Sequence, residues 1–173
     1  ASAELDFTSS ESQNVSFESW QKLADAGDPE AQFMMGLFHE NGQGVVADAD
    51  VAFGWYEMSA NQAYAPAQNN LGMMLFEGNG CDADVESAVA WYRQAAEQGF
   101  APAENNLGVA YLVDSNMPED DQKAVRWLES AAKQGNDKAQ CMMGTLCFEG
   151  RGIEKNDEEA ARWFQLASDQ GNS

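Results

Sequence analysis

A strict internal repeat of 36 residues constrains the fold of this sequence more than any other feature. Three positions recur at that spacing without insertion or deletion. They are an alanine (Ala31, Ala67, Ala103, Ala139), a glycine (Gly36, Gly72, Gly108, Gly144) and a tryptophan (Trp55, Trp91, Trp127, Trp163). A period of about 20 to 50 residues is typical of solenoids, in which each unit buries the apolar face of its neighbour. The sequence therefore predicts a stack of similar units rather than one central core.

Each unit is predicted to form two antiparallel helices. The first helix starts close to the repeated alanine and ends at paired glycines, such as Gly78 and Gly80, which supply the positive φ of a tight reversal. The second helix is expected to open on a capping residue, which is Asp48, Asp84, Asp120 or Asn156 in the four units. Asn156 and Glu159 together predict a capping box. Ala63 stands where other units end this helix with glycine, so that turn is expected to differ.

The second helix carries large and small apolar residues on one face. Ala88, Trp91, Tyr92, Ala95 and Ala96 show the i, i+3, i+4, i+7, i+8 spacing of a buried helical stripe. The small residues allow close helix approach, and each repeated tryptophan is predicted to be a structural wedge worth about 3–5 kcal/mol on truncation.

These patterns divide the chain into a lead-in and one repeat domain. Residues 1–14 are acidic and serine-rich with little apolar periodicity, and predict a flexible lead-in. From 15 to 173 we expect a single domain. It comprises a partial repeat at 15–30 and full repeats at 31–66, 67–102, 103–138 and 139–173.

The combination A-x-x-x-L-G, G-x-G, D-x-x-x-A-x-x-W-Y and A-A-x-x-G at this period resembles the Sel1-like repeat, a relative of the tetratricopeptide repeat. The copy that matches best runs from Ala67 to Gly99. The resemblance implies a right-handed α-solenoid that acts as a scaffold for protein–protein interaction, common in bacteria and often periplasmic or secreted, and not an enzyme. This chain lacks the cysteine pair in each repeat that marks one branch of the family.

Charge restricts the partners. The sequence has 29 Asp and Glu against 9 Lys and Arg, a formal net charge of -20, which repels nucleic acid and anionic membranes. The acidity either keeps an extended surface soluble or steers the chain toward a basic protein. No apolar run is long enough to insert in a membrane. Ala1-Ser2-Ala3 resembles the end of a signal-peptide cleavage region, so we expect a periplasmic or secreted protein, with the cytoplasm as the alternative.

The face of the first helix that the repeat frame leaves free is the predicted partner-binding surface. At 100° per residue, positions 33, 37 and 40 lie opposite the framework positions, and by family analogy they line the concave side. The predicted contact residues are Phe33, Leu37, Glu40, Asn69, Met73, Phe76, Asn105, Val109, Leu112 and Phe148. Exposed apolar residues of this kind mark partner sites, but each of these side chains could instead pack between adjacent repeats.

Other residues that can carry chemistry have structural explanations. His39 is the only histidine, which excludes His-based triads and two-His metal sites within one chain, so we expect it to pack. The three cysteines are an odd number and predict no disulfide framework. Residues 114–121 gather carboxylates but fail the EF-hand pattern. Ser19-x-x-Lys22 matches a penicillin-binding motif without its companion motifs.

The sequence therefore predicts no catalytic, cofactor or metal residues and no small-molecule substrate. The expected function is a scaffold that binds a partner protein or peptide. One alternative is an immunity or inhibitor protein that neutralises a basic secreted bacterial toxin, which only the charge supports. A remote alternative is an enzyme with β-lactamase-like activity.

Overall fold

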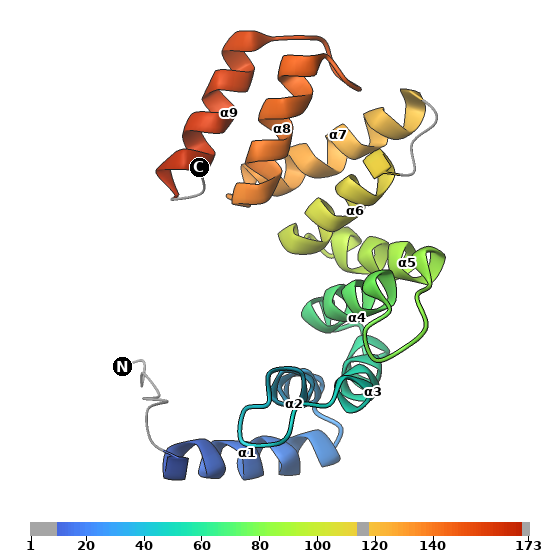
Figure 1. The fold of residues 1–173 in the computed structure, drawn as a ribbon, viewed down its shortest axis with the longest axis vertical. Coiled ribbons are helices and arrows are strands. Elements are labelled where there is room, and N and C mark those ends of the chain that lie inside the picture. Colours follow the sequence, from blue (N-terminus) through green and yellow to red (C-terminus); the bar gives the residue numbers. More distant parts are fainter. Residues whose placement is uncertain (1–9, 114–117, 171–173) are drawn as a thin grey trace. The chain divides into compact units, whose positions relative to one another are not determined.

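The chain is all-α wherever its structure is described. The computed structural model describes residues 10–113 and 118–170, and no strand occurs in these ranges (Figure 1). The helices in chain order are α1 (Ser10–Asp25), α2 (Pro29–Asn41), α3 (Ala49–Ala60), α4 (Ala65–Glu77), α5 (Val85–Glu97), α6 (Ala101–Val113), α7 (Pro118–Lys133), α8 (Asp137–Glu149) and α9 (Asp157–Asp169). The predicted flexible lead-in overlaps α1, which begins at Ser10 rather than at residue 15, and residues 1–9 lie outside the described part.

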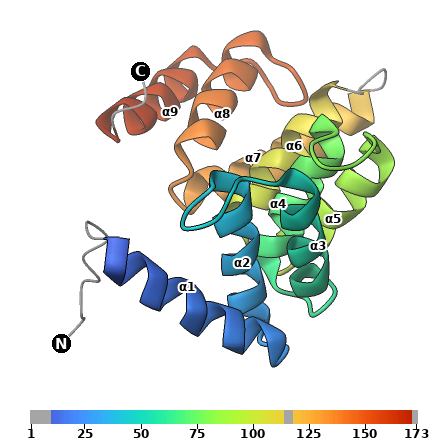
Figure 2. The same cartoon turned by 60° about the horizontal axis from the view of Figure 1, so that its bottom comes forward.

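The helices form two compact units, residues 1–91 and residues 92–173. In the first unit α1 packs on α2, α2 on α3 and α3 on α4, a succession that is visible in two views (Figures 1 and 2). In the second unit α6 packs on α7, α7 on α8 and α8 on α9. Helix α5 belongs to both units, and Trp91 is the last residue of the first one. Pairs of consecutive antiparallel helices are thus the structural unit in each part.

The connection between the two helices of a pair is built from local hydrogen bonds. Helix α2 ends at Gly42, whose φ is 66° and whose N–H donates to the Phe38 carbonyl. The backbone N–H of Asp48 then donates to the His39 carbonyl at 2.9 Å, which closes the loop, and the Asp48 carboxylate caps α3 by accepting from the Val51 N–H at 3.1 Å. The predicted glycine turn and aspartate cap are both confirmed here.

The predicted cap of α7 is wrong. This helix begins at Pro118, so Asp120 lies inside its first turn and not before it. Its carboxylate forms an ion pair with Lys123 at 2.8 Å. Proline is favoured in a first helical turn, where its missing N–H has no intrahelical partner, and so the helix can start at Pro118. Asp114 and Asn116, which stand at the repeat positions of the turn glycines Gly78 and Gly80, lie outside the described residues.

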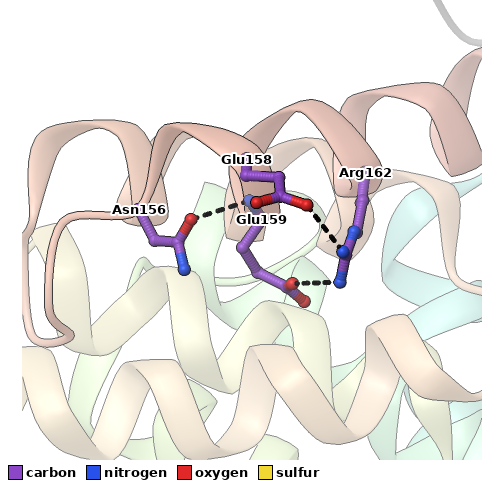
Figure 3. A network of polar contacts seen from close by, with 4 residues as sticks. All are labelled: Asn156, Glu158, Glu159 and Arg162. Carbon is purple, nitrogen blue, oxygen red and sulfur yellow. Dashed lines mark hydrogen bonds and ion pairs between the residues drawn. The ribbon is translucent and has the colours of Figure 1, made fainter.

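Only half of the predicted capping box forms at the start of α9 (Figure 3). The Asn156 side chain accepts from the Glu159 N–H at 3.0 Å, as the box requires. The reciprocal bond is absent, because the Asn156 N–H donates to the Cys147 carbonyl at 2.8 Å and the Glu159 carboxylate accepts from Arg162 at 3.3 Å. The loop-closing hydrogen bond therefore takes the donor that a complete box would need.

Close packing of each pair depends on the repeated glycine of the first helix. A methyl group at Gly36 would overlap the ring of Tyr56, and one at Gly108 would lie 2.6 Å from Cγ of Leu128. Tyr56 and Leu128 are fully buried, and each contributes about 1.5–3 kcal/mol through burial. The residue after the repeated tryptophan is therefore the one seated on the glycine. The repeated tryptophans are packed as well: Trp55 is half-buried against a core of α1 and α2, and Trp163 is 9% exposed in the core of α7, α8 and α9.

Packing between successive pairs depends on the second glycine of the turn. A methyl group at Gly80 would overlap the carbonyl of Ala49, at the start of α3, and one at Gly152 would lie 2.6 Å from the carbonyl of Asp121. The same position in the first pair is Gly44, where a methyl group would meet no atom within 4 Å. The turn glycine thus allows two backbones to approach wherever a preceding pair is present.

Candidate protein-interaction surface

Two neighbouring first helices of the first unit carry six of the predicted contact residues. We call this set the α2–α4 surface: Phe33, Leu37 and Glu40 on α2, and Asn69, Met73 and Phe76 on α4. On α2 the residues at 33, 37 and 40 follow i, i+4, i+7 spacing, which places them on one side of the helix. Asp28 fixes the start of that helix by accepting from the Ala31 N–H at 2.8 Å.

The apolar residues of α2 pack between consecutive helix pairs. Phe33 and Leu37 are half-buried against the core that α3 and α4 share. The Phe33 ring lies 5.6 Å from the Tyr56 ring and 5.5 Å from the Tyr64 ring, measured between centroids. Packing between repeats, one of the two explanations that the sequence left open, therefore accounts for most of the area of these two side chains.

The apolar residues of α4 are exposed instead. Met73 and Phe76 are each 40% exposed and lie three residues apart, so they are neighbours on the helix surface. Asn69, one turn earlier, is buried, and its Nδ2 donates to the sulfur of Met73 at 3.6 Å. Exposed apolar side chains of this size on one helix face provide an area that a partner can cover.

A chain of polar contacts connects Glu40 of α2 to α4. The Tyr56 hydroxyl donates to Oε2 of Glu40 at 2.5 Å and accepts a hydrogen bond from the Asn70 side chain. Nδ2 of Asn69 donates to Oδ1 of Asn70 at 3.3 Å. Burial, followed by the Glu40 hydrogen bond, raises the pKa of Tyr56 far above its usual value. The phenol therefore stays protonated and remains a donor to Glu40 at any physiological pH.

The other predicted contact residues belong to the second unit and differ in environment. Asn105 is 7% exposed, and its Oδ1 has no hydrogen-bond partner in the described part of the chain. Val109 and Leu112 are half-buried against the core of α7, α8 and α9. Phe148 is 55% exposed, but Nζ of Lys155 lies 4.8 Å from the centroid of its ring. The Phe148 ring is thus already covered by a cation of the same chain.

The two units also differ in charge. Residues 1–91 contain 15 Asp and Glu and one Lys or Arg, Lys22, whereas residues 92–173 contain 14 and eight. All the ion pairs of the described residues lie in the second unit; Arg162, for example, contacts both Glu158 and Glu159 (Figure 3). None of the carboxylates described between residues 17 and 91 is ion-paired. The α2–α4 surface therefore lies in a strongly negative unit that cannot neutralise itself.

Tyr56 and Asn70 were not predicted as parts of this surface. Tyr56 belongs to the buried stripe of the second helix, and its hydroxyl is informative only once Glu40 is placed beside it. The Asn-Asn pair offered a signal, because it recurs at residues 69–70 and 105–106 while the other two repeats have apolar residues there.

The other candidate residues form no recognisable site. His39 is half-buried with its ring 6.4 Å from that of Phe17, consistent with the expected packing role. The three cysteines are free, and Cys147 is buried. Within the described ranges, no three His, Cys, Asp or Glu side chains gather as they would around a metal ion; residues 114–117 of the acidic loop lie outside those ranges. None of the described helices has both the length and the apolar character needed to cross a bilayer.

The helices of the described part and the 36-residue spacing together define an all-α repeat protein. A model of the Sel1 repeat matches residues 29–64, 65–100, 101–136 and 137–172, each range starting two residues before the predicted repeat. The chain therefore belongs to the Sel1 repeat family. This confirms both the resemblance and the predicted all-α solenoid-like fold of 36-residue helix pairs. Members of this family typically mediate protein–protein interaction and are generally not enzymes.

Solved structures with the same fold come from several bacteria. A protective antigen of uropathogenic Escherichia coli strains, described as displaying an SLR fold, is 35% identical with a TM-score of 0.84, over 90% of this chain and 33% of that one. A Sel1 repeat protein from Oxalobacter formigenes is 29% identical with a TM-score of 0.85, over 91% and 63%. An immunity protein from Pseudomonas aeruginosa is 20% identical with a TM-score of 0.61, over 90% and 58%, and shows similarity of fold alone.

The chain thus spans about a third of the Escherichia coli protein and 63% of the Oxalobacter one. No curated protein matched the sequence.

Proposed function

We propose that this chain is a non-enzymatic binding module that holds a cationic partner protein on the α2–α4 surface. The observation that carries the proposal is the coincidence of exposed Met73 and Phe76 with a unit that has 15 acidic residues, a single Lys and no ion pair in its described part. Apolar contact supplies affinity at short range, while the uncompensated charge attracts and orients a basic protein over longer distances. The family membership supports protein binding in general.

Affinity capture from a bacterial lysate tests the proposal. The wild type is compared with Met73→Asp plus Phe76→Asp, and with Met58→Asp as the control, because Met58 is 43% exposed on α3, outside the α2–α4 surface. Circular dichroism checks that all variants keep the same helix content. We expect the double variant to lose a captured protein that the wild type and the control both retain. Equal capture by all of them would refute the assignment of the surface.

Salt dependence tests the electrostatic part. Association with the captured protein should slow as ionic strength rises from about 0.01 M to about 0.5 M, because the Debye length falls from about 30 Å to a few ångströms over that range. An association rate that does not respond to salt would remove steering from the proposal while leaving the apolar contact in place.

A narrower proposal is that the cationic partner is a secreted bacterial toxin which this chain neutralises. Its support is the net charge of -20 together with a fold shared with the Pseudomonas immunity protein. The sequence identity to that protein, 20%, shows similarity of fold alone. Once a partner has been captured, expressing it alone and together with this chain decides the matter. A partner that is harmless when expressed alone would refute the toxin proposal and leave the binding proposal standing.

The competing class is an enzyme. Ser19 and Lys22 of the S-x-x-K motif are both exposed on α1, on a helix surface rather than in a pocket. We expect no hydrolysis of a chromogenic β-lactam by the purified protein. Turnover that disappears in Ser19→Ala would overturn the non-enzymatic proposal.

A further inference from the structure

The geometry of the α2–α4 surface points to a specific subsite for a cationic side chain. We propose that the Glu40 carboxylate, oriented by Tyr56, binds an arginine of the partner while an adjacent apolar side chain of the partner covers Met73 and Phe76. This inference rests on the proposed function and deepens it, because it names the chemistry that the surface recognises. The occupant is an exposed segment of another protein in which arginine neighbours an apolar residue.

The first argument is that Glu40 is held in place without a cation. Oε2 of this exposed carboxylate accepts from the buried Tyr56 hydroxyl, while Oε1 accepts no hydrogen bond in the described part of the chain. A flexible surface glutamate loses rotamer entropy when a partner orders it. Because Tyr56 has already restricted Glu40, part of that loss precedes binding, which favours a partner that donates to Oε1.

The second argument is that the subsite lies beside an apolar area. The polar contacts that start at Glu40 pass through Tyr56, Asn70 and Asn69 and end at the sulfur of Met73. Phe76 follows Met73 by one turn of α4. Arginine suits this combination better than lysine, because its guanidinium donates in a planar fork to a carboxylate, is weakly hydrated and can lie on apolar or aromatic surfaces.

The third argument is charge complementarity. The comparable exposed ring in the second unit, Phe148, is covered by Lys155 of the same chain, whereas the first unit contains no lysine or arginine besides Lys22 of α1. A second copy of this chain is a poor occupant, because it would bring 29 acidic residues against 9 cations, and most of the cations of its second unit are already ion-paired. A basic protein supplies the missing charge.

Fluorescence anisotropy with synthetic peptides tests the subsite on the full chain. The probe is a fluorescein-labelled peptide of four Arg-Leu-Ser triplets, and its partner probe of four Arg-Ser-Ser triplets has the same charge without the apolar residue. We expect the first peptide to bind more tightly. Glu40→Gln should weaken its binding at least about tenfold, whereas Glu57→Gln, which removes an equal charge from an exposed position on α3, should change it less than about twofold.

Two further pairs of variants complete the test. Met73→Ser should weaken binding of the Arg-Leu-Ser peptide, and Met58→Ser, at an equally exposed methionine of α3, should not. Tyr56→Phe keeps the buried ring but removes the donor, so it should weaken binding in the wild-type background and have no further effect once Glu40 is Gln. This dependence is the property of a positioning residue and would not follow from a packing defect.

Several results would overturn the subsite. They are equal binding of both peptides, equal effects of Glu40→Gln and Glu57→Gln, or no binding of the Arg-Leu-Ser peptide at low salt. Self-association of the chain in analytical ultracentrifugation that is lost in Glu40→Gln would assign the surface to a second copy instead. Capture of a partner protein that fails in Met73→Asp plus Phe76→Asp but persists in Glu40→Gln would refute the subsite and retain the binding function.

Discussion

Replacing the buried Glu104 with glutamine should stabilise the protein at neutral pH. Glu104 is 3% exposed on α6, where its carboxylate accepts from Ser130 Oγ at 2.9 Å and from Gln134 Nε2 at 2.8 Å. The other three repeats have glutamine at this position. In the same unit, Gln140 accepts from the Gln170 amide at 2.8 Å and also donates to a backbone carbonyl eight residues earlier, at 3.1 Å. An ionised carboxylate cannot make that second bond.

The size of the effect follows from these contacts. Glu104→Gln keeps an acceptor for Gln134 and loses the charged hydrogen bond to Ser130. It gains a donor for the Ala96 carbonyl, and this new hydrogen bond by itself is worth about 0.5–1.5 kcal/mol. It also removes a buried charge. Burial raises the pKa of Glu104 even though the Ser130 and Gln134 hydrogen bonds act to lower it, so desolvation outweighs the two donors. We expect a net gain of about 1–2 kcal/mol at pH 7, or roughly 2–4 °C in Tm for each kcal/mol.

The pH dependence has a defined sign. The folded-state pKa of Glu104 is raised above its unfolded value, so the cost of ionisation is absent below the unfolded pKa, near 4.3, and fully present above the folded pKa. Urea denaturation at about pH 5 and about pH 8 measures the free energy of unfolding of variant and wild type. Subtracting one from the other at each pH cancels the contribution of the other carboxylates, which titrate in both proteins. The advantage of Glu104→Gln should grow as pH rises. Gln140→Glu is the reciprocal control and should lose stability with the same trend. An advantage for glutamine that is equal at both pH values would refute the ionisation argument.

Three other predictions concern the turns and one thiol. Ala63 has a φ of 61° and Gly99, at the same position of the next repeat, has a φ of 79°. Ala63→Gly should therefore stabilise the protein by about 0.5–1 kcal/mol, and Gly99→Ala, where a methyl group meets no atom within 4 Å, should destabilise it by a similar amount. Thermal unfolding measures both changes, and a shift of both variants in the same direction would contradict the prediction. Gly80→Ala should lower the free energy of unfolding by about 1–3 kcal/mol more than Gly44→Ala. Both glycines have positive φ, but only Gly80 lies against a backbone carbonyl. Equal urea midpoints for the two variants would exclude that contact. Cys147 is 1% exposed, and burial raises the pKa of its thiol. In the native state it should therefore react with a disulfide reagent more slowly than the other two cysteines. Equal rates for all three thiols would show that Cys147 is not buried.

The positive φ of Ala63 shows where local sequence rules gave a wrong prediction. Because alanine rarely adopts the left-handed conformation, the turn was expected to differ from the glycine turns of the other repeats. It keeps the same hydrogen bonds, with the Ala63 N–H donating to the Ala60 carbonyl at 2.9 Å as the Gly99 N–H does to Ala96. The packing of α3 and α4 on each side outweighs a local cost of about 1–2 kcal/mol.

The repeat, the pairing of helices, the turn glycines and most of the helix caps could all be predicted from the order of the residues. These features depend on residues a few positions apart, such as Asp48 and the N–H of Val51, or on the 36-residue period, which is evident when the repeats are aligned with one another. The same spacing predicted which face of the first helices would bind a partner, but it could not distinguish the buried residues of that face from the exposed ones. Positions 37 and 73 are equivalent in the repeat, yet Leu37 is half-buried and Met73 is 40% exposed.

Which residues of the first helices are exposed depends on contacts between helices that are distant in the sequence. Whether Phe33 packs or is exposed depends on Tyr56 and Tyr64, which lie 23 and 31 residues later in the chain. The contacts of Tyr56 with Glu40 and with Asn70 likewise join three helices. The absence of ion pairs among the described residues of the first unit is evident only once their side chains have been placed. Burial and hydrogen bonding between helices depend on the helices that lie next to each residue in space, and the helical period does not contain that information.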